Sequence, residues 1–336
     1  MAQRIQFRND TLANWTAANP VLAAGELGLE SDTRFYKIGD GVTPWNNLPY
    51  AVLRTLDSIQ VAEMEEQATP AVPGPGKLKF YAKSLGGRMM LRQIGPSGLS
   101  TPLQPSFFQN SITFIGPSAT TALSAIGNSV TSTGTISHPN VSEAYGYMAN
   151  IASAASANTT AGTGTASTLW LRGGLGGGGF FFATRAAFPD AGYNETGIGT
   201  GTRIFTGMTS LALSAAVASN SPAGHHAGFQ RLHVNASTLD ENWFFLTGNG
   251  TTNNRIDTGL QFLPGKIYDA YIFCPPSGNV ISWRIDNLTD ALTASGETST
   301  HLPATDALLR AGIQLQTVNA VVRNLRLQRI YIESDR

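Results

Sequence analysis

Five histidines are the first residues to consider for chemistry, and two of them, His225 and His226, are adjacent. On a strand, neighbouring side chains point to opposite faces, so these two could not easily bind one metal ion. On a loop they could, with His233 as a third ligand, but no cysteine or carboxylate lies at ligand spacing. We therefore expect no metal site, and His225 and His226 are interpreted as loop residues that could contact a ligand.

The carboxylates are the second group, since a glycosidase needs two of them facing each other across a sugar. Asp257 precedes Thr258-Gly259 and suits a turn, whereas Asp269 lies inside an apolar run and suits a hydrogen-bonded structural role. The chain contains no G-x-S-x-G, H-E-x-x-H or Walker string and no short-period repeat of a β-helix. We expect no enzyme and no cofactor. The carboxylates considered for such a pair are Asp190, Glu195, Asp240, Glu241, Asp257 and Asp269.

A glycine-rich stretch and a single cysteine complete the set of reactive patterns. Residues 174–179 match G-x-G-x-x-G, but a dinucleotide site needs a helix after this string, and a β-prone run of three phenylalanines follows instead. We therefore interpret residues 174–179 as the loop that enters a strand. Cys274 lies in an apolar segment and is expected to be a buried small hydrophobe.

Composition narrows the class of protein. Charged residues make up 13% of the 336 residues, against about 25% in ordinary domains, while 42% are hydrophobic and 36 are glycine. Such a chain is typical of ordered, all-β proteins. The formal net charge of zero gives no electrostatic footprint for nucleic acid. We find no signal peptide and no run of 18 apolar residues, so we expect no membrane insertion and synthesis in a cytoplasm.

The first 50 residues predict a small, turn-dense β unit. Ile5 and Phe7 alternate with polar neighbours, as on one face of a half-buried strand. Residues 35–38 form a second expected strand that runs into an Asp-Gly turn, and Trp45 follows as an apolar anchor. A unit of this size buries little surface, so it should need a partner, either copies of itself or a larger assembly.

The middle of the chain is less regular. Residues 56–105 are expected to form a connector and a β-hairpin bead, in which Gly86-Gly87 makes the turn. Residues 106–179 are expected to be a linker region with short strands. Within it, apolar spacing of three and four predicts a short helix at 142–155, and the Thr/Gly/Ala-rich residues 156–167 predict an exposed loop.

From residue 180 to residue 336, turn signals recur every eight to twelve residues, which is the rhythm of a β-sandwich. The expected strands are 180–188, 202–210, 226–234, 242–247, 255–262, 266–274, 279–287, 307–316 and 321–333. Sugar recognition favours aromatic and planar polar groups in loops at the end of a sandwich. The candidates are Tyr193, Asn194, His225, His226, Trp243 and Asn249, with Trp243 as well suited to the core as to a ligand platform.

Several strings also carry a resemblance. Trp15, Asn19-Pro20, Gly25-Glu26, Lys37-Ile38-Gly39-Asp40-Gly41, Trp45 and Leu48-Pro49-Tyr50 occur in the order and spacing of one N-terminal module. That segment resembles the module that opens bacteriophage tail fibres, receptor-binding proteins and tropism-determinant proteins, with Arg34 replacing the more usual Gly or Lys of a turn. The resemblance implies that residues 1–55 form an intertwined homotrimer near the virion attachment point.

Two later segments resemble phage fibre proteins as well. The Gly-Lys-Leu strand, Gly-rich turn and Thr-Pro-Leu of residues 76–103 are similar to a recurrent bead of such fibres. Strings such as Arg203–Gly207, Tyr268–Phe273 and Trp283–Leu288 resemble their C-terminal lectin-like sandwich. This similarity implies a mostly β fold with a jelly-roll or concanavalin-type topology.

Taken together, the sequence predicts a homotrimeric virion protein, a tail fibre or receptor-binding protein that adheres to a host surface glycan or protein. Its other partners would be phage tail or capsid proteins bound through the N-terminal region. Two alternatives remain open at this point: a capsid-bound head fibre or decoration protein without a specific receptor, and a polysaccharide depolymerase.

Overall fold

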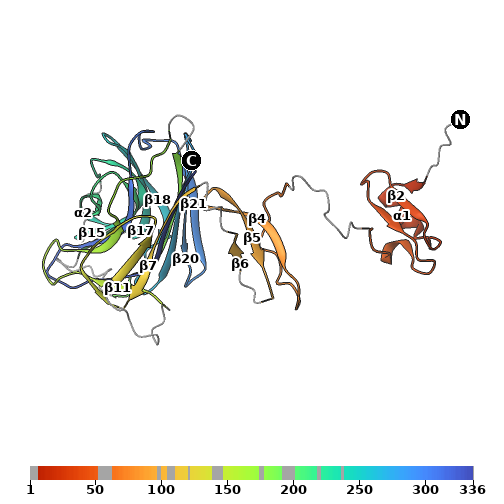
Figure 1. Cartoon of the computed structure of the whole chain (residues 1–336), viewed down its shortest axis with the longest axis horizontal. Coiled ribbons are helices and arrows are strands. Elements are labelled where there is room, and N and C mark those ends of the chain that lie inside the picture. The colour runs from red at the N-terminus through yellow and green to blue at the C-terminus, as the bar shows by residue number, and fades with distance from the viewer. Residues whose placement is uncertain are drawn as a thin grey trace. The chain divides into compact units, whose positions relative to one another are not determined.

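The computed structural model describes residues 7–51, 63–96, 100–103, 110–119, 122–137, 147–173, 178–190, 201–217, 221–235 and 238–335 (Figure 1). The chain divides into two compact units, residues 1–63 and 64–336. The second unit consists mostly of strands, as expected, whereas the described part of the first unit contains three short strands, one helix and one 3-10 turn. None of the helices in the described part is long and apolar enough to cross a membrane.

The first unit is built on two stacked tryptophans. Strand β1 (Arg8–Asp10) pairs in parallel with β2 (Leu27–Glu30), which pairs antiparallel with β3 (Tyr36–Ile38). Helix α1 (Leu12–Ala18), which was not expected, and the 3-10 turn η1 (Trp45–Asn47) pack beside this sheet. The rings of Trp15 and Trp45 stack with centroids 4.2 Å apart, and Leu22 and Leu48 complete the buried cluster. Trp45 is therefore the anchor that the sequence predicted.

The turns of the first unit explain its polar residues. The Asp40 carboxylate accepts hydrogen bonds from the backbone of Val42 and Thr43 and from the Thr43 hydroxyl, and these bonds lower the pKa of Asp40 to about 2. Gly41 has φ +82°, as an Asp-Gly turn requires. Arg34 has φ +64°, a conformation that glycine adopts without cost. This explains why glycine is common at that position of the module.

One expectation for this unit was wrong. Phe7 was placed on a half-buried face, but its side chain is 55% exposed. Phe35, Ile38 and Val42 are also exposed, Val42 to 77%. Phe7 directly precedes β1, which begins at Arg8, and it does not lie on a face that the described residues of this unit cover. Ile5 lies outside the described residues.

The second unit begins with the predicted bead. Strands β4 (Lys79–Leu85), β5 (Arg88–Ile94) and β6 (Ser100–Pro102) form an antiparallel sheet, which we call the bead. Gly86 and Gly87 make the turn between β4 and β5 at φ +60° and +84°. The turn chemistry of the sequence thus predicted this hairpin correctly.

The rest of the second unit is a β-sandwich of two antiparallel sheets. Figure 1 shows them packed face to face. The nine-stranded sheet runs in the order β10 (Thr135–Ser137), β11 (Ala149–Ala152), β23 (Asn324–Asp335), β13 (Gly178–Ala187), β19 (Ile267–Cys274), β20 (Ile281–Asn287) and β21 (Leu292–Thr298), and β7 (Asn110–Ala119) pairs with β23 and with β8 (Ala122–Ile126).

The eight-stranded sheet runs in the order β18 (Asn253–Gln261), β17 (Asn242–Asn249), β15 (His225–Asn235), β14 (Thr202–Thr209), β22 (Arg310–Thr317), β12 (Thr160–Thr165) and β9 (Val130–Thr133), and β16 (Thr238–Leu239) pairs with β15. Helix α2 (Leu213–Val217) packs on β14 and β22. The nine strands expected after residue 180 all occur, and the sequence analysis missed β16 and β21.

The boundary of the sandwich differs from the expectation. Strands β7 to β12 belong to its sheets, so it begins near residue 110, and residues 106–179 are not a linker region. Residues 149–152, expected to be helical, form β11, because Ala149 and Ile151 alternate into the core and pair with β23. Residues 160–165, expected in a loop, form the buried strand β12. Residues 142–146 lie outside the described part.

The core between the sheets is aromatic and aliphatic. Trp243, Phe188, Phe262 and Tyr268 pack as one cluster, with ring centroids between 5.3 and 6.4 Å apart. Cys274 is buried in this core, and burial raises the pKa of its thiol to about 12. The prediction that Cys274 is an unreactive core residue is consistent with this protonated state.

Candidate functional site

The structure distributes the six predicted receptor-binding residues among different environments. Tyr193 and Asn194 lie outside the described residues. Trp243 is 1% exposed and packs edge-on against Phe262 and Tyr268, so it is a core residue and not a ligand platform. Of the two roles that the sequence left open for Trp243, the structure supports the core, because its side chain lies on the inward face of β17.

His226 is also not a loop residue. It lies in β15, is fully buried, and its Nδ1 donates to the Gly224 carbonyl at 2.8 Å. Burial lowers the pKa of His226 to about 4, so the ring is neutral near pH 7. A ligand outside the protein cannot reach this side chain, and we remove it from the candidates.

His225 and Asn249 do lie together, as cross-strand partners where β15 and β17 meet. The Asn249 side-chain oxygen accepts from the backbone of Thr251 and Thr252 at 3.0 and 2.8 Å, and His225 Nδ1 accepts from the Ala304 backbone at 3.2 Å. The Thr252 hydroxyl lies 3.0 Å from His301 Nδ1. These hydrogen bonds hold the loop at residues 249–252 in place, and no carboxylate takes part in them. In the part of the chain that the structure describes, no three His, Cys, Asp or Glu side chains gather as for a metal.

The candidate carboxylates for a glycosidase are held by structural hydrogen bonds. Asp190 accepts from the Asn324 backbone, Asp240 from the Leu232 backbone, and Asp257 from the Gly259 backbone. The sequence predicted a turn at Asp257, but this residue lies within β18 beside an irregularity in its pairing with β17, where its carboxylate holds the Gly259 backbone. Glu195 lies outside the described residues, and Glu241 is exposed.

A different site lies on the outer face of the nine-stranded sheet. In β13, Phe180 and Phe182 point into the core, so Phe181 and Arg185 point outward. On the neighbouring strands, β19 and β23, Tyr271 and Tyr331 lie on the same outer face. Aromatic rings on a face that would normally be wet require a cover.

The bead is that cover. The Leu85 and Met90 side chains pack against Phe181, Tyr271 and Tyr331. At the hairpin turn, a Cβ on Gly86 would lie 2.9 Å from the Tyr271 Cβ, and one on Gly87 would overlap the Ser282 side chain. The two glycines thus allow both the turn and a close approach to the sheet. Bead and sandwich form one packed body.

An ion pair fixes the bead at its tip. Arg88, the first residue after the turn, pairs with Glu333 of β23, and its guanidinium lies 5.2 Å from the Phe181 ring centroid. Glu333 is 1% exposed. A buried carboxylate needs such a partner, because leaving it unpaired in the interior is costly.

A cavity of about 430 Å³ remains between the bead and the sheet. We call it the bead cavity. Its walls combine apolar, aromatic and guanidinium groups. The lining residues are Leu85, Met90, Arg92, Ser100, Pro102, Leu103, Phe114, Phe181, Ala183, Arg185, Tyr271, Arg329 and Tyr331.

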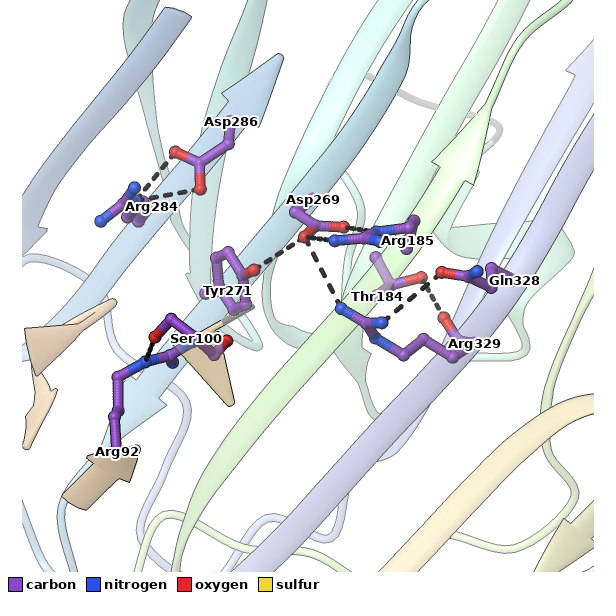
Figure 2. A network of polar contacts seen from close by, with 10 residues as sticks. All are labelled: Arg92, Ser100, Thr184, Arg185, Asp269, Tyr271, Arg284, Asp286, Gln328 and Arg329. Carbon is purple, nitrogen blue, oxygen red and sulfur yellow. Dashed lines mark hydrogen bonds and ion pairs between the residues drawn. The ribbon is translucent and has the colours of Figure 1, made fainter. Parts of the chain in front are cut away.

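Asp269 is contacted by three residues that line the bead cavity, Arg185, Tyr271 and Arg329 (Figure 2). Arg185 donates to both of its oxygens at 2.6 Å, Tyr271 donates at 2.8 Å, and Arg329 lies at 3.6 Å. Asp269 raises the pKa of Arg185, chiefly through the hydrogen bonds, so this guanidinium stays charged. The prediction that Asp269 is a hydrogen-bonded carboxylate is confirmed, but its neighbours line a cavity.

The sequence analysis missed the bead cavity because it looked for a site in loops. One signal was available. The outward positions of β13 and β23 carry Phe181 and Tyr331, and a sheet with one face in water does not call for large aromatic rings there. Which segment covers them could not be deduced from periodicity.

Comparisons with known proteins identify the N-terminal segment. Residues 5–43 match the family model of the major tropism determinant N-terminal domain. A protein named hyaluronoglucosaminidase, from Streptococcus pyogenes phage H4489A, is 38% identical over 47 residues. That stretch is 14% of this chain and 13% of the phage protein. The predicted resemblance of the first 50 residues to a tropism-determinant module is thereby confirmed.

Solved structures match the sandwich at low identity. A protein of unknown function from Shewanella oneidensis MR-1 is 15% identical, with a TM-score of 0.41, over 68% of this chain and 87% of that one. Peanut lectin is 8% identical, with a TM-score of 0.45, over 67% and 97%. Lectin II from Ulex europaeus is 9% identical, with a TM-score of 0.44, over 62% and 93%. Likenesses below a TM-score of 0.5 say nothing about a binding site.

Proposed function

We propose that this chain is a phage receptor-binding protein that is carried on the virion by its N-terminal unit and adheres to the bacterial host surface through its second unit. The observation that carries the proposal is the match of residues 5–43 to the tropism-determinant N-terminal domain. The proposal extends that observation to the whole chain. It includes adhesion to a glycan or protein of the host and attachment to tail or capsid proteins.

The same unit supports the proposal of a homotrimer. Among the described residues 7–51, its buried apolar cluster consists of Trp15, Leu22, Trp45 and Leu48, while Phe35 and Val42 are 61% and 77% exposed. Small units with so little core gain stability when exposed apolar side chains are buried against copies of themselves. Three copies would also join three weak contacts with a cell into firm adhesion.

We propose adhesion without catalysis. The carboxylates that a glycosidase would need are engaged by backbone groups at Asp190, Asp240 and Asp257 and by arginine at Asp269. The name of the phage hyaluronoglucosaminidase describes that protein, of which the matched stretch is only 13%. Incubation of the purified chain with capsular polysaccharides should release no new reducing ends.

The proposal is tested with the whole chain. Fluorescently labelled protein is added to a panel of bacterial strains that includes the host, and the same unlabelled protein competes with phage infection. We expect saturable staining of the host and reduced infection. A trimeric, folded protein that stains no strain would contradict adhesion and favour a head fibre or decoration protein, and immunogold labelling would then place it on the capsid.

Light scattering tests the assembly independently. We expect the mass of three 35.5 kDa chains at micromolar concentration. A stable monomer would contradict the trimer, whatever the outcome of the staining.

A further inference from the structure

We propose that the bead cavity binds a carboxylated sugar of the host surface glycan. The inference rests on the proposed adhesive function and adds the site and the ligand class to it. Three features of the cavity point to this ligand: its charge, its aromatic wall and the way its arginines are held.

The charge of the bead cavity favours an anion. Arg92, Arg185 and Arg329 line it, and the carboxylate in contact with two of them is Asp269. Arg92 donates to the hydroxyl and the carbonyl of Ser100, both at 2.9 Å, and these groups are neutral. Three guanidiniums against one carboxylate leave a positive excess. Arginine recognises carboxylates particularly well, because its planar fork can donate two parallel hydrogen bonds.

The aromatic wall favours a sugar ring over a small inorganic anion. Phe181 stacks near Tyr271 at a centroid distance of 6.4 Å and meets Tyr331 edge-on at 6.3 Å. Phe181 and Tyr271 are buried, and Tyr271 donates its hydroxyl to Asp269. Tyr331 donates its hydroxyl to Glu333 and is half-buried, and Phe114 is exposed, so the rings of Tyr331 and Phe114 are the surface that remains for a ligand. The apolar face of a sugar packs on such rings, while charged groups at the margin fix its orientation.

The size of the cavity agrees with this ligand. Its volume of about 430 Å³ falls within the range of roughly 300–1,000 Å³ that small-molecule sites occupy. The site is also formed before the ligand arrives, since the bead is fixed to the sheet by the Arg88–Glu333 pair. A preformed cavity costs less ordering entropy on binding than a mobile loop does.

The three arginines have different roles. Arg185 is fixed by two hydrogen bonds of 2.6 Å to Asp269, which makes it a positioning residue for the network. Arg329 lies 3.6 Å from Asp269 and 3.5 Å from Gln328 Oε1, so it is held loosely (Figure 2). Arg92 approaches from the bead, where neutral groups hold it. Arg92 and Arg329 are therefore the residues that would donate to the sugar carboxylate.

The experiment measures binding of acidic oligosaccharides to the full chain by calorimetry. The probes are oligomers of hyaluronan, galacturonate, mannuronate and sialic acid, each also in a carboxyl-reduced, neutral form. We expect at least one acidic probe to bind, and its reduced form to bind at least about tenfold more weakly. Arg92→Gln and Arg329→Gln should each weaken binding by about tenfold.

Arg284→Gln is the matched control. Arg284 lies on β20 and pairs with Asp286 at 2.8 Å, and it does not line the bead cavity. Its replacement should leave binding unchanged. Thermal unfolding of each variant verifies that the bead remains folded.

Three results would overturn the inference: no acidic probe binds, binding survives carboxyl reduction, or both cavity variants bind as the unmodified chain does. Binding that survives carboxyl reduction would show that the cavity recognises a neutral part of the sugar and not its carboxylate. Cell staining separates the two proposals. Host staining that persists in Arg92→Gln and Arg329→Gln would leave the adhesive function standing and reject the cavity as its site.

Discussion

Arg185 and Asp269 face each other across β13 and β19, and the guanidinium donates one hydrogen bond of 2.6 Å to each carboxylate oxygen. Asp269 is 2% exposed. The pair holds Arg185, which lines the bead cavity, in a fixed position. Its loss should therefore lower the stability of the fold and change the shape of the cavity.

We predict that Asp269→Asn lowers the free energy of unfolding by about 2–4 kcal/mol, because it leaves Arg185 without its charged partner in a half-buried place. Chemical denaturation of the two proteins measures this difference. Asp290→Asn provides the comparison, since its pair with Lys266 lies on the surface and should contribute little. Equal effects of the two substitutions would contradict the structural role of Asp269.

His226 should make stability depend on pH. Its pKa is about 4 in the folded chain against 6.5 for an ordinary histidine, so the unfolded chain binds the proton more readily. Neutral His226 therefore contributes its full share to the free energy of unfolding above pH 6.5. This contribution, at most about 3 kcal/mol, is lost as the pH falls from 6.5 to 4.

His226→Asn should therefore reduce the slope of stability against pH between 6.5 and 4 in denaturation experiments. His301→Asn is the control, because His301 is exposed and asparagine tolerates its φ of +48°. The control should keep the slope of the unmodified chain. An unchanged slope in His226→Asn would show that another group carries the pH dependence.

The hairpin glycine can be tested by adding a methyl group. Gly87→Ala should cost about 2–4 kcal/mol of unfolding free energy, because φ is +84° and the new Cβ meets the Ser282 side chain. Gly76→Ala has a similar φ of +72° but open space around it, so it should cost only about 1 kcal/mol. The excess in Gly87→Ala measures the contact of the bead with the sheet. If the two costs are equal, this contact does not form in solution.

The tryptophan pair of the first unit predicts a separable transition. Trp45→Ala removes one of its four buried apolar residues and should cost about 3–5 kcal/mol, enough to unfold so small a core. Calorimetry should show loss of the transition of residues 1–63, while that of residues 64–336 keeps its midpoint. A single transition that shifts as a whole would mean that the two units unfold together.

The sequence predicted much of the fold after residue 180, because strands that alternate into one core, such as β19 and β23, carry their period in their own residues. It failed at β12, where Thr, Gly and Ala alone fill a central strand between β22 and β9. Small residues there allow the neighbouring strands to approach closely. An exposed loop can have the same Thr/Gly/Ala composition, so composition alone could not distinguish the two. At β11, alanine spacing fits a helix and a strand, and pairing with β23 decides between them.

The candidate site could be predicted only in part. Asp269 and Asp257 were assigned structural roles from their local context, and both carboxylates make structural hydrogen bonds, although Asp257 lies in β18 and not in the expected turn. Whether Trp243 and His226 are buried depends on what covers each strand face, and the covering residues lie in other segments of the chain. The bead cavity joins residues of the bead to residues of β13 and β23, more than 200 positions apart at the extremes, so no local window contains it.

The place of β23 in the sheet has a consequence for synthesis. It follows all the other described strands in sequence, yet it lies inside the nine-stranded sheet, with β13 on one side and β11 and β7 on the other. During synthesis, the edges of these three strands that pair with β23 stay unpaired until residues 324–335 have left the ribosome. A product that stops short of β23 would present those edges to other chains and aggregate.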